Sequence, residues 1–166
     1  MTSPAIPPLP ITALAIPAPL AKALAERGYA ELTPVQMSVL APEAAGRDLL
    51  VSSQTGSGKT VAFGVAIGPT LLGDEFRIAP AADPLALVIA PTRELALQVE
   101  QAAVRYGRWQ KRLRTVCLIG GAPFGPQLRA LGEGVDIVVA TPGRLADHLE
   151  RGRVDLSAVG LLVLDE

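Results

Sequence analysis

The sequence is short of cysteine, of net charge and of long apolar runs. Its single cysteine, Cys117, excludes an internal disulfide framework and suits a reducing compartment such as the cytoplasm. The 15 lysines and arginines nearly balance the 16 aspartates and glutamates, so the net charge is −1 and any attraction to nucleic acid has to come from local patches. No apolar run reaches the roughly 18 residues that a membrane span requires. We therefore expect no disulfide scaffold and no membrane partner.

The chain has enough apolar residues to form a core. Hydrophobic residues make up 49% of the 166 residues and charged residues 19%, which is typical of one folded domain. The N-terminus is apolar, but prolines interrupt it and it lacks a basic start, which argues against a secretory signal. We expect an irregular proline-rich arm over residues 1–17 and a domain over residues 18–166.

Short apolar runs alternate with helical patterns along this domain. The strands are expected at residues 49–51, 85–90, 115–119, 136–140 and 161–164. The helices are expected at residues 20–27, 34–45, 59–72, 92–106, 126–131 and 144–150. This alternation predicts an α/β domain with a parallel sheet and helices on both faces. Ligands of such domains bind beyond the carboxyl ends of the strands.

The stretch VSSQTGSGKT, residues 51–60, has the features of a phosphate-binding loop between a strand and a helix. The usual pattern has glycine where this chain has Ser53, but that position lies at the strand end, where a small residue should be tolerated. Lys59 is expected to reach the terminal phosphates, and the Thr60 hydroxyl to ligate Mg²⁺. The backbone N–H groups that would face phosphate oxygens belong to Gln54, Thr55, Gly56, Ser57 and Gly58. The alternative is a glycine-rich turn without a ligand.

An apolar strand that ends in acids completes such a site. Asp165 follows the run at residues 161–164 and is expected to hold Mg²⁺ through water, while Glu166 would be the catalytic base that polarises the attacking water. The alternative is a solvated strand end, which Lys59 and Thr60 upstream make less favourable.

With these elements in place, residues 11–166 resemble the first RecA-like domain of a DEAD-box ATP-dependent RNA helicase, a P-loop domain. The matching pieces are Gly28-Tyr29 with Thr33-Pro-Val-Gln36, Ser53-Gln-Thr-Gly-Ser-Gly-Lys-Thr60, Pro91-Thr-Arg-Glu-Leu95, Gly120-Gly121, Thr141-Pro-Gly-Arg144 and Val163-Leu-Asp-Glu166. The last of these is the first half of the DEAD tetrapeptide. Six such elements in the right order are not a chance match.

The resemblance implies roles for the matching positions. Gln36 would read the adenine edge of ATP, Thr33 would support that loop, and Tyr29 belongs to the same ATP-binding element. The residues implied to contact the RNA backbone are Pro91, Thr92, Arg93, Gly121, Thr141, Pro142, Gly143 and Arg144. The physics agrees, because free N–H groups at helix starts attract phosphates and the two arginines add charge. Recognition of the backbone alone would be largely independent of RNA sequence.

The resemblance also implies parts that lie outside this sequence. A second RecA-like domain of the same protein completes the ATP site, so this chain alone is not expected to unwind RNA. In this fold a later strand inserts between the phosphate-loop strand and the strand before Asp165, so we expect the chain to belong to a larger folded unit. The chain departs from the family at Ser53, where alanine is usual, and at Ile11, where an aromatic ring would stack on adenine.

Two other functions stay open on the sequence alone. One is a non-catalytic module that binds ATP or RNA, and the other is a different P-loop translocase of nucleic acid, which Gln36 and the Thr141–Arg144 element disfavour. The basic segment 105–114, with Trp109, is interpreted as a solvated helix end more readily than as an RNA surface. His148 is expected to face solvent, and Cys117 to be a buried structural thiol.

Overall fold

The computed structural model describes residues 16, 18–54, 56–72, 83–107 and 113–165. The elements, in chain order, are α1 (Ala18–Glu26), α2 (Pro34–Leu40), a 3-10 helix (Pro42–Ala44), α3 (Lys59–Leu72), β1 (Ala86–Ile89), α4 (Arg93–Gly107), β2 (Thr115–Leu118), α5 (Phe124–Glu133), β3 (Ile137–Ala140), α6 (Pro142–Glu150) and β4 (Leu161–Leu164). No helix in these ranges is long and apolar enough to cross a bilayer. The N-terminal arm up to Ala15, Thr55, Trp109 and Glu166 lie outside the described residues.

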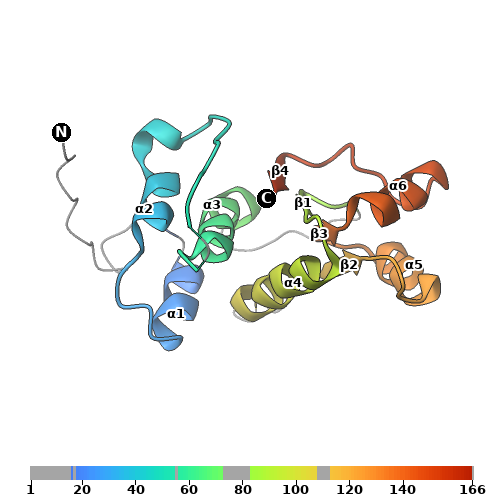
Figure 1. Ribbon diagram of the computed structural model, residues 1–166, viewed down its shortest axis with the longest axis horizontal. Coiled ribbons are helices and arrows are strands. Elements are labelled where there is room, and N and C mark those ends of the chain that lie inside the picture. Colours follow the sequence, from blue (N-terminus) through green and yellow to red (C-terminus); the bar gives the residue numbers. More distant parts are fainter. Residues whose placement is uncertain (1–15, 17, 55, 73–82, 108–112, 166) are drawn as a thin grey trace.

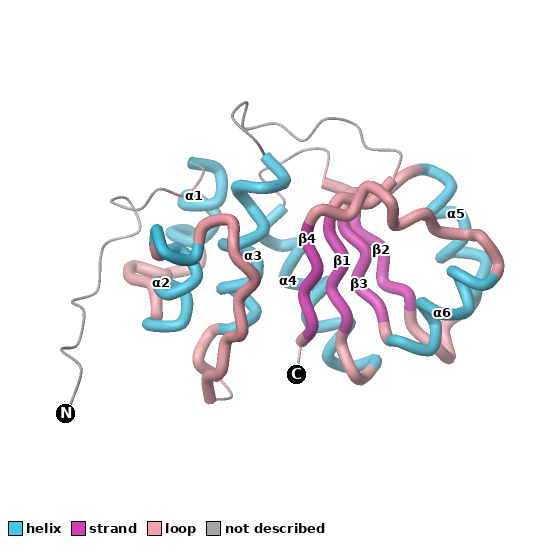
Figure 2. The backbone as a smooth tube through the Cα atoms, turned by 90° about the horizontal axis from the view of Figure 1, so that it is seen from above, coloured by secondary structure: helices cyan, strands magenta, loops and turns pink. Residues whose placement is uncertain are grey.

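The four strands form one parallel sheet in the order β2-β3-β1-β4. Ala86 of β1 is in register with Ile137 of β3 on one side and with Leu161 of β4 on the other. Figure 2 shows the four strands side by side, with β4 at one edge and β2 at the other. The predicted parallel sheet is confirmed, and its carboxyl ends all lie at one end of the domain.

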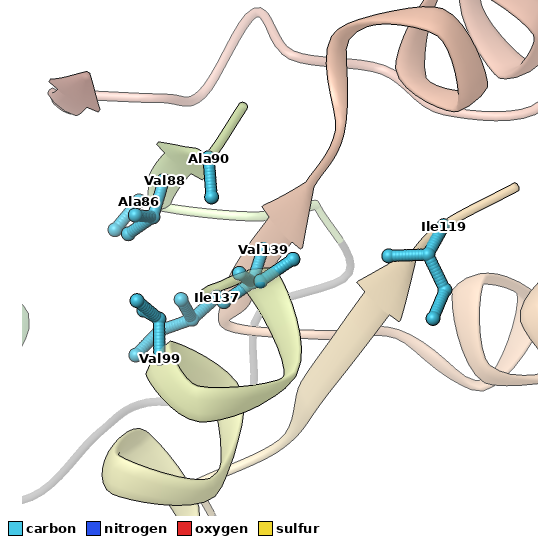
Figure 3. Close-up of a cluster of buried hydrophobic side chains, with 8 residues drawn as sticks. Ala86, Val88, Ala90, Val99, Ile119, Ile137 and Val139 are labelled. Carbon is cyan, nitrogen blue, oxygen red and sulfur yellow. The ribbon is translucent and has the colours of Figure 1, made fainter. Parts of the chain in front are cut away.

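Helices cover both faces of this sheet, as predicted. On one face, Val88 and Val139 pack against Val99 of α4, and Figure 3 shows Val99 facing Ile137 and Val139. On the other face, the buried residues are Leu87, Val116, Leu118, Val135, Val138, Ala140 and Leu145. Each fully buried valine or leucine contributes roughly 1.5–3 kcal/mol. Consecutive apolar residues in β1 and β3 therefore serve two cores, which explains their uninterrupted runs.

The strand predicted at residues 49–51 is wrong, because residues 48–54 have no regular secondary structure. Leu49 is 47% exposed and Leu50 102% exposed. A strand exists only where a neighbour satisfies its backbone groups, and β4 pairs with β1 alone within the described residues. Leu162 and Leu164 on β4 are also exposed, by 56% and 69%. Both segments between which the resemblance predicts a further strand therefore expose leucine side chains.

Helices α1, α2 and α3 form a group of their own beside the sheet (Figure 1). Its small core comprises Leu20, Leu24, Leu32, Val61 and Val65. Helix α1 ends at Glu26, and Gly28 follows with a φ of +78°, which places Tyr29 so that its N–H donates to the Leu24 carbonyl at 3.2 Å. Helix α2 is shorter than predicted, because Pro42 keeps Ala41 extended at ψ 141° and a separate 3-10 turn follows.

Candidate functional site

The phosphate-binding loop leads directly into α3, as predicted. Gly56 and Gly58 have φ values of +81° and +91°, which side-chain-bearing residues rarely adopt. Helix α3 begins at Lys59, so Lys59 and Thr60 occupy its first turn, where free backbone N–H groups favour an anion. The two glycine conformations and the helix start agree with the predicted phosphate-binding loop, whose role stays a prediction.

Ser53 contributes a contact that the sequence analysis missed. Its hydroxyl lies 2.6 Å from the Ser57 hydroxyl, and the Ser57 N–H donates to the Gln54 carbonyl at 3.2 Å. The first position of the loop is thus hydrogen-bonded to its tip instead of merely tolerating a small residue. The spacing of four residues between two serines was the available signal.

Gln36 connects the N-terminal helices to the loop. Its side-chain oxygen accepts the Thr33 N–H at 3.0 Å, and its amide nitrogen donates to the Gly58 carbonyl at 3.2 Å. A Cβ on Gly58 would collide with this amide, so the loop approaches Gln36 as closely as glycine permits. Gln36 is fully buried. These two bonds use one N–H and one lone pair of its amide, which has a further N–H and a further lone pair.

Thr33 and Tyr29, the two other residues of this predicted ATP-binding element, precede Gln36 in the chain. The Thr33 hydroxyl is buried and has no hydrogen-bond partner among the described residues. Tyr29 is half-buried and packs against the small core of α1 and α3. An unpartnered buried hydroxyl costs about 1–3 kcal/mol, so a ligand or water that reached Thr33 would be favoured there.

Asp165 lies at the end of β4, next to the ends of the neighbouring strands. Its N–H donates to the Ile89 carbonyl at 2.9 Å, which extends the β1–β4 ladder, and the residue is 8% exposed. Helix α3 lies against β4. In Figure 2 the loop before α3 and the end of β4 lie at the same end of the molecule. No group of three or more acidic, histidine or cysteine side chains that could hold a metal occurs among the described residues.

A hydroxyl from Thr60 and a carboxylate from Asp165 suit Mg²⁺, because this ion is usually held by one or two protein oxygens together with phosphates and waters. The donor set therefore fits Mg²⁺ bound with a nucleotide, and it does not form a metal cage of its own.

The predicted RNA-contacting residues follow the carboxyl ends of β1, β2 and β3, either in the loop after the strand or in the first turn of the next helix. Gly121, with φ +75°, faces Arg93 so closely that a Cβ there would lie 2.5 Å from Arg93 Nη1. The Thr92 hydroxyl accepts the Leu95 N–H at 3.3 Å at the start of α4. Two elements that are well separated in sequence therefore meet at Gly121.

After β3, Arg144 lies in the first turn of α6. Its Nη1 donates to the Ala122 carbonyl at 3.4 Å, and its guanidinium lies 4.7 Å from the centre of the Phe124 ring. Thr141 precedes α6 without a side-chain cap, so the first N–H groups of α6 stay open to an anion. Thr141 and Arg144 are half-buried; the exposed members of the predicted set are Pro91, Thr92, Arg93, Gly121, Pro142 and Gly143.

The expectation that His148 faces solvent is wrong. Its ring is fully buried, stacks on Phe124 at 4.4 Å and 17°, and lies 3.0 Å from the Gln127 side-chain oxygen through Nε2. Burial, and then the positive charge of Arg144, lower the pKa of His148 below its ordinary value. His148 follows the buried Leu145 by three residues, and this helical spacing was the signal for burial.

Two further polar groups are structural. Cys117 is half-buried against the α4-side core, and burial raises the pKa of its thiol to about 12, so it is a poor nucleophile as expected. Asp136, a residue the sequence analysis did not single out, is buried, and its Oδ2 accepts the Arg114 N–H at 2.7 Å. This bond ties the start of β3 to the residue before β2.

A phosphate loop at the start of a helix, a strand that ends in an acid, and a parallel sheet together define a P-loop nucleotide-binding domain. Residues 33–166 match the family model described as DEAD/DEAH box helicase. The chain belongs to the DEAD/DEAH box helicase family.

Relatives and one solved structure agree with this assignment. The chain is 42% identical to "DEAD-box ATP-dependent RNA helicase 9" of Oryza sativa subsp. japonica, covering 95% of this chain and 24% of that protein. It is 44% identical to "ATP-dependent RNA helicase DeaD" of Escherichia coli strain K12, covering 92% of this chain and 23% of that protein. The crystal structure of a DEAD box protein from Methanococcus jannaschii matches with a TM-score of 0.80 and 29% identity, over 95% of this chain and 41% of that one. The chain spans about a quarter of the curated relatives it matches.

Proposed function

We propose that this chain is the ATP-binding part of an ATP-dependent RNA helicase, in which ATP binding and hydrolysis drive the unwinding or remodelling of RNA duplexes. One observation carries the proposal: in a member of this family, the predicted phosphate loop, the acid after β4 and the segments that follow β1, β2 and β3 lie at the same end of the molecule. The relatives that bear the name ATP-dependent RNA helicase support the choice of RNA.

The ATP site is built from α3 and the loops beside it. Backbone N–H groups of residues 54–58 bind phosphate oxygens, and the Lys59 ammonium neutralises charge on the terminal phosphates. Gln36 reads the adenine edge, with Thr33 and Tyr29 holding its loop. Thr60 and Asp165 hold Mg²⁺, which supplies charge neutralisation on the phosphates when it is bound. Glu166 orients and deprotonates the attacking water.

The RNA path runs over the loops after β1, β2 and β3. Its contacts are backbone contacts, made by the helix N-termini after Thr92 and Thr141 and by the charges of Arg93 and Arg144. Gly121 permits close approach of a phosphate, because any side chain there would meet Arg93. Such contacts carry little sequence information, so the helicase accepts many RNA sequences.

The rest of the helicase is also part of the proposal. A second RecA-like domain of the same protein closes on the ATP and RNA sites. A further strand fills the gap between β4 and the segment before the phosphate loop, where leucines are exposed on both sides. The free thiol of Cys117 suits work in a reducing compartment such as the cytoplasm.

The test is ATP hydrolysis by the whole protein that contains this chain. Hydrolysis is measured without nucleic acid, with single-stranded RNA, and with single-stranded DNA of the same length. We expect RNA to raise the rate at least about tenfold and DNA to have little effect. Equal stimulation by DNA would assign the chain to a different translocase, and no hydrolysis with either would assign it to a non-catalytic module.

A further inference from the structure

The glycine turn at residues 120–121 is held from both sides by side chains of two helices. On its N-terminal side, the Gln127 amide nitrogen of α5 donates to the Ile119 carbonyl at 3.0 Å. On its C-terminal side, Arg144 of α6 donates to the Ala122 carbonyl at 3.4 Å. The turn that carries one candidate RNA contact is therefore fixed by its two flanking carbonyls.

His148 links these two supports. A carbonyl can only accept, so the Ile119 carbonyl orients the Gln127 amide with its nitrogen toward the turn and its oxygen toward His148. That oxygen also only accepts, so the proton of the imidazole must be on Nε2. Nδ1 is then a bare nitrogen, buried and without a hydrogen-bond partner among the described residues. The chain of donors and acceptors thus fixes a single neutral tautomer of His148.

The same imidazole is held by its ring. It stacks on Phe124 at the start of α5, and the Arg144 guanidinium lies 4.7 Å from the centre of that Phe124 ring. Phe124 therefore contacts both the residue that orients Gln127 and the residue that holds the Ala122 carbonyl. Neither Gln127 nor His148 is exposed enough to touch a ligand, as both are 5% exposed or less.

We propose that Gln127 and His148 are positioning residues for RNA binding, which hold the glycine turn and the N-terminal end of α6 in one fixed arrangement. The inference rests on the proposed function. A phosphate backbone has a fixed spacing, so two loops that each contact it bind well only when their separation is fixed in advance. Without the bond from Gln127, the turn would have to be ordered when RNA binds.

The experiment compares variants of the whole protein by RNA affinity, measured by fluorescence anisotropy with a labelled single-stranded RNA and a non-hydrolysable ATP analogue. Gln127→Met removes both hydrogen bonds but keeps the side-chain length. His148→Phe keeps a ring against Phe124 but removes the Nε2 donor, whereas His148→Gln places an N–H donor near the Nε2 position. Gln98→Met makes the same substitution as Gln127→Met at an exposed position of α4 and is the matched control.

We expect Gln127→Met and His148→Phe each to weaken RNA binding about three- to tenfold, because each leaves the turn to be ordered when RNA binds, at a cost comparable to one hydrogen bond. The Kd for the ATP analogue should not change, and the double variant should be no weaker than the worse single one. His148→Gln should recover most of the RNA affinity, and Gln98→Met should equal wild type. In steady-state hydrolysis, the RNA concentration for half-maximal rate should rise while kcat at saturating RNA stays constant.

A purely stabilising pair would lower the melting temperature of the variants and leave the RNA Kd of the folded protein within twofold of wild type, which would overturn the inference. Histidine nitrogen NMR on the wild-type protein is a second test, which does not depend on RNA affinity. A signal of the Nε2–H tautomer, assigned by its loss in His148→Phe, is expected. The Nδ1–H tautomer would overturn the inference.

The two levels of proposal fail in different ways. If wild type binds RNA and the variants bind equally well, only the positioning role is wrong. If wild type binds no RNA in any nucleotide state, the proposed function falls and the positioning role falls with it.

Discussion

The sheet region comprises β1–β4 with α4–α6, and the phosphate-loop region comprises residues 46–58 with α1–α3. The two regions differ in how far their apolar residues are buried. In the sheet region both faces of β1 and β3 are buried. In the phosphate-loop region, Leu49 and Leu50 reach solvent although they directly precede the loop. The central strands of the first region are flanked on both sides, whereas the segment before the predicted phosphate loop pairs with no strand among the described residues.

This difference indicates that the loop and a strand before it have separate structural requirements. The loop needs glycines, Lys59 and the start of α3, and all of these are encoded within a few residues. A strand before the loop would need a neighbouring strand from a distant part of the protein. Substitutions can therefore remove the nucleotide chemistry of the loop without changing the packing around it, or the reverse.

The largest effect is expected from Lys59→Ala, which removes the ammonium of the loop and changes no residue of the hydrophobic cores. ATP hydrolysis by the whole protein at saturating RNA should fall a hundred- to thousandfold, because the ammonium stabilises charge on the phosphates. The melting temperature should stay the same. Lys22→Ala on the exposed side of α1 is the control. A rate within threefold of wild type for Lys59→Ala would contradict the assigned role.

The contribution of side-chain packing to stability is tested by truncating one leucine in each region of the 166-residue chain. Leu118→Ala, at a position with no exposed surface, should reduce the free energy of unfolding by about 3 kcal/mol, whereas Leu50→Ala should cost less than about 0.5 kcal/mol. Urea denaturation measures both values.

The same two substitutions can be measured in the longer protein and compared with their costs in the 166-residue chain. There Leu50→Ala should cost about 2 kcal/mol or more, if a further strand covers this segment as proposed. Equal, small costs of Leu50→Ala in the short and the long protein would show that the segment stays uncovered.

A smaller effect is expected from acid on the sheet region. The folded pKa of His148 lies below its ordinary value of 6.5, because of burial first and the charges of Arg144 and Arg151, while Asp147 opposes the shift. The unfolded chain then takes up the proton first, so the contribution to stability is complete above about pH 6.5 and is lost as the pH falls toward the folded pKa.

Urea denaturation at pH 7.5 and pH 5.5 checks this dependence. The loss of stability between the two values should be smaller in His148→Phe, which has no titrating ring at this position. A loss of the same size in the variant and in wild type would assign the pH dependence to other groups.

The smallest effect is expected from Ser53→Ala, which installs the residue that is usual in the family. It removes the hydroxyl contact to Ser57, so the empty loop should become less ordered and ATP affinity should change by no more than about threefold. Titration with a fluorescent ATP analogue measures this change. A change above tenfold would mean that Ser53 contacts the nucleotide itself.

Much of the fold was predictable because its signals are local. The uninterrupted apolar runs of β1 and β3 predicted central strands, and the start of α3 at Lys59 followed from the glycine loop. The segment at residues 49–51 has the same apolar character, and the prediction of a strand there was wrong. Nothing within those three residues reports whether a partner strand is present.

The candidate site was predictable in its members but not in its connections. The roles of Lys59 and Gln36 came from motif spacing and stay predictions. The bond from Gln36 to Gly58 could not be read from the sequence, since it joins residues on different elements. For His148 the helical spacing from Leu145 was informative, but the polar character of histidine outweighed it in the interpretation.

The order of the strands has a consequence for synthesis of the protein. Every strand pair is parallel and joins distant parts of the chain, and both partners of β1 follow it in sequence. On the ribosome, β1 therefore emerges long before β3 and β4 can flank it, and until then only helices such as α3 and α4 can cover it. Long-range pairing of this kind is slow and leaves aggregation-prone intermediates. The growing chain should need protection by chaperones at least until β3 is released.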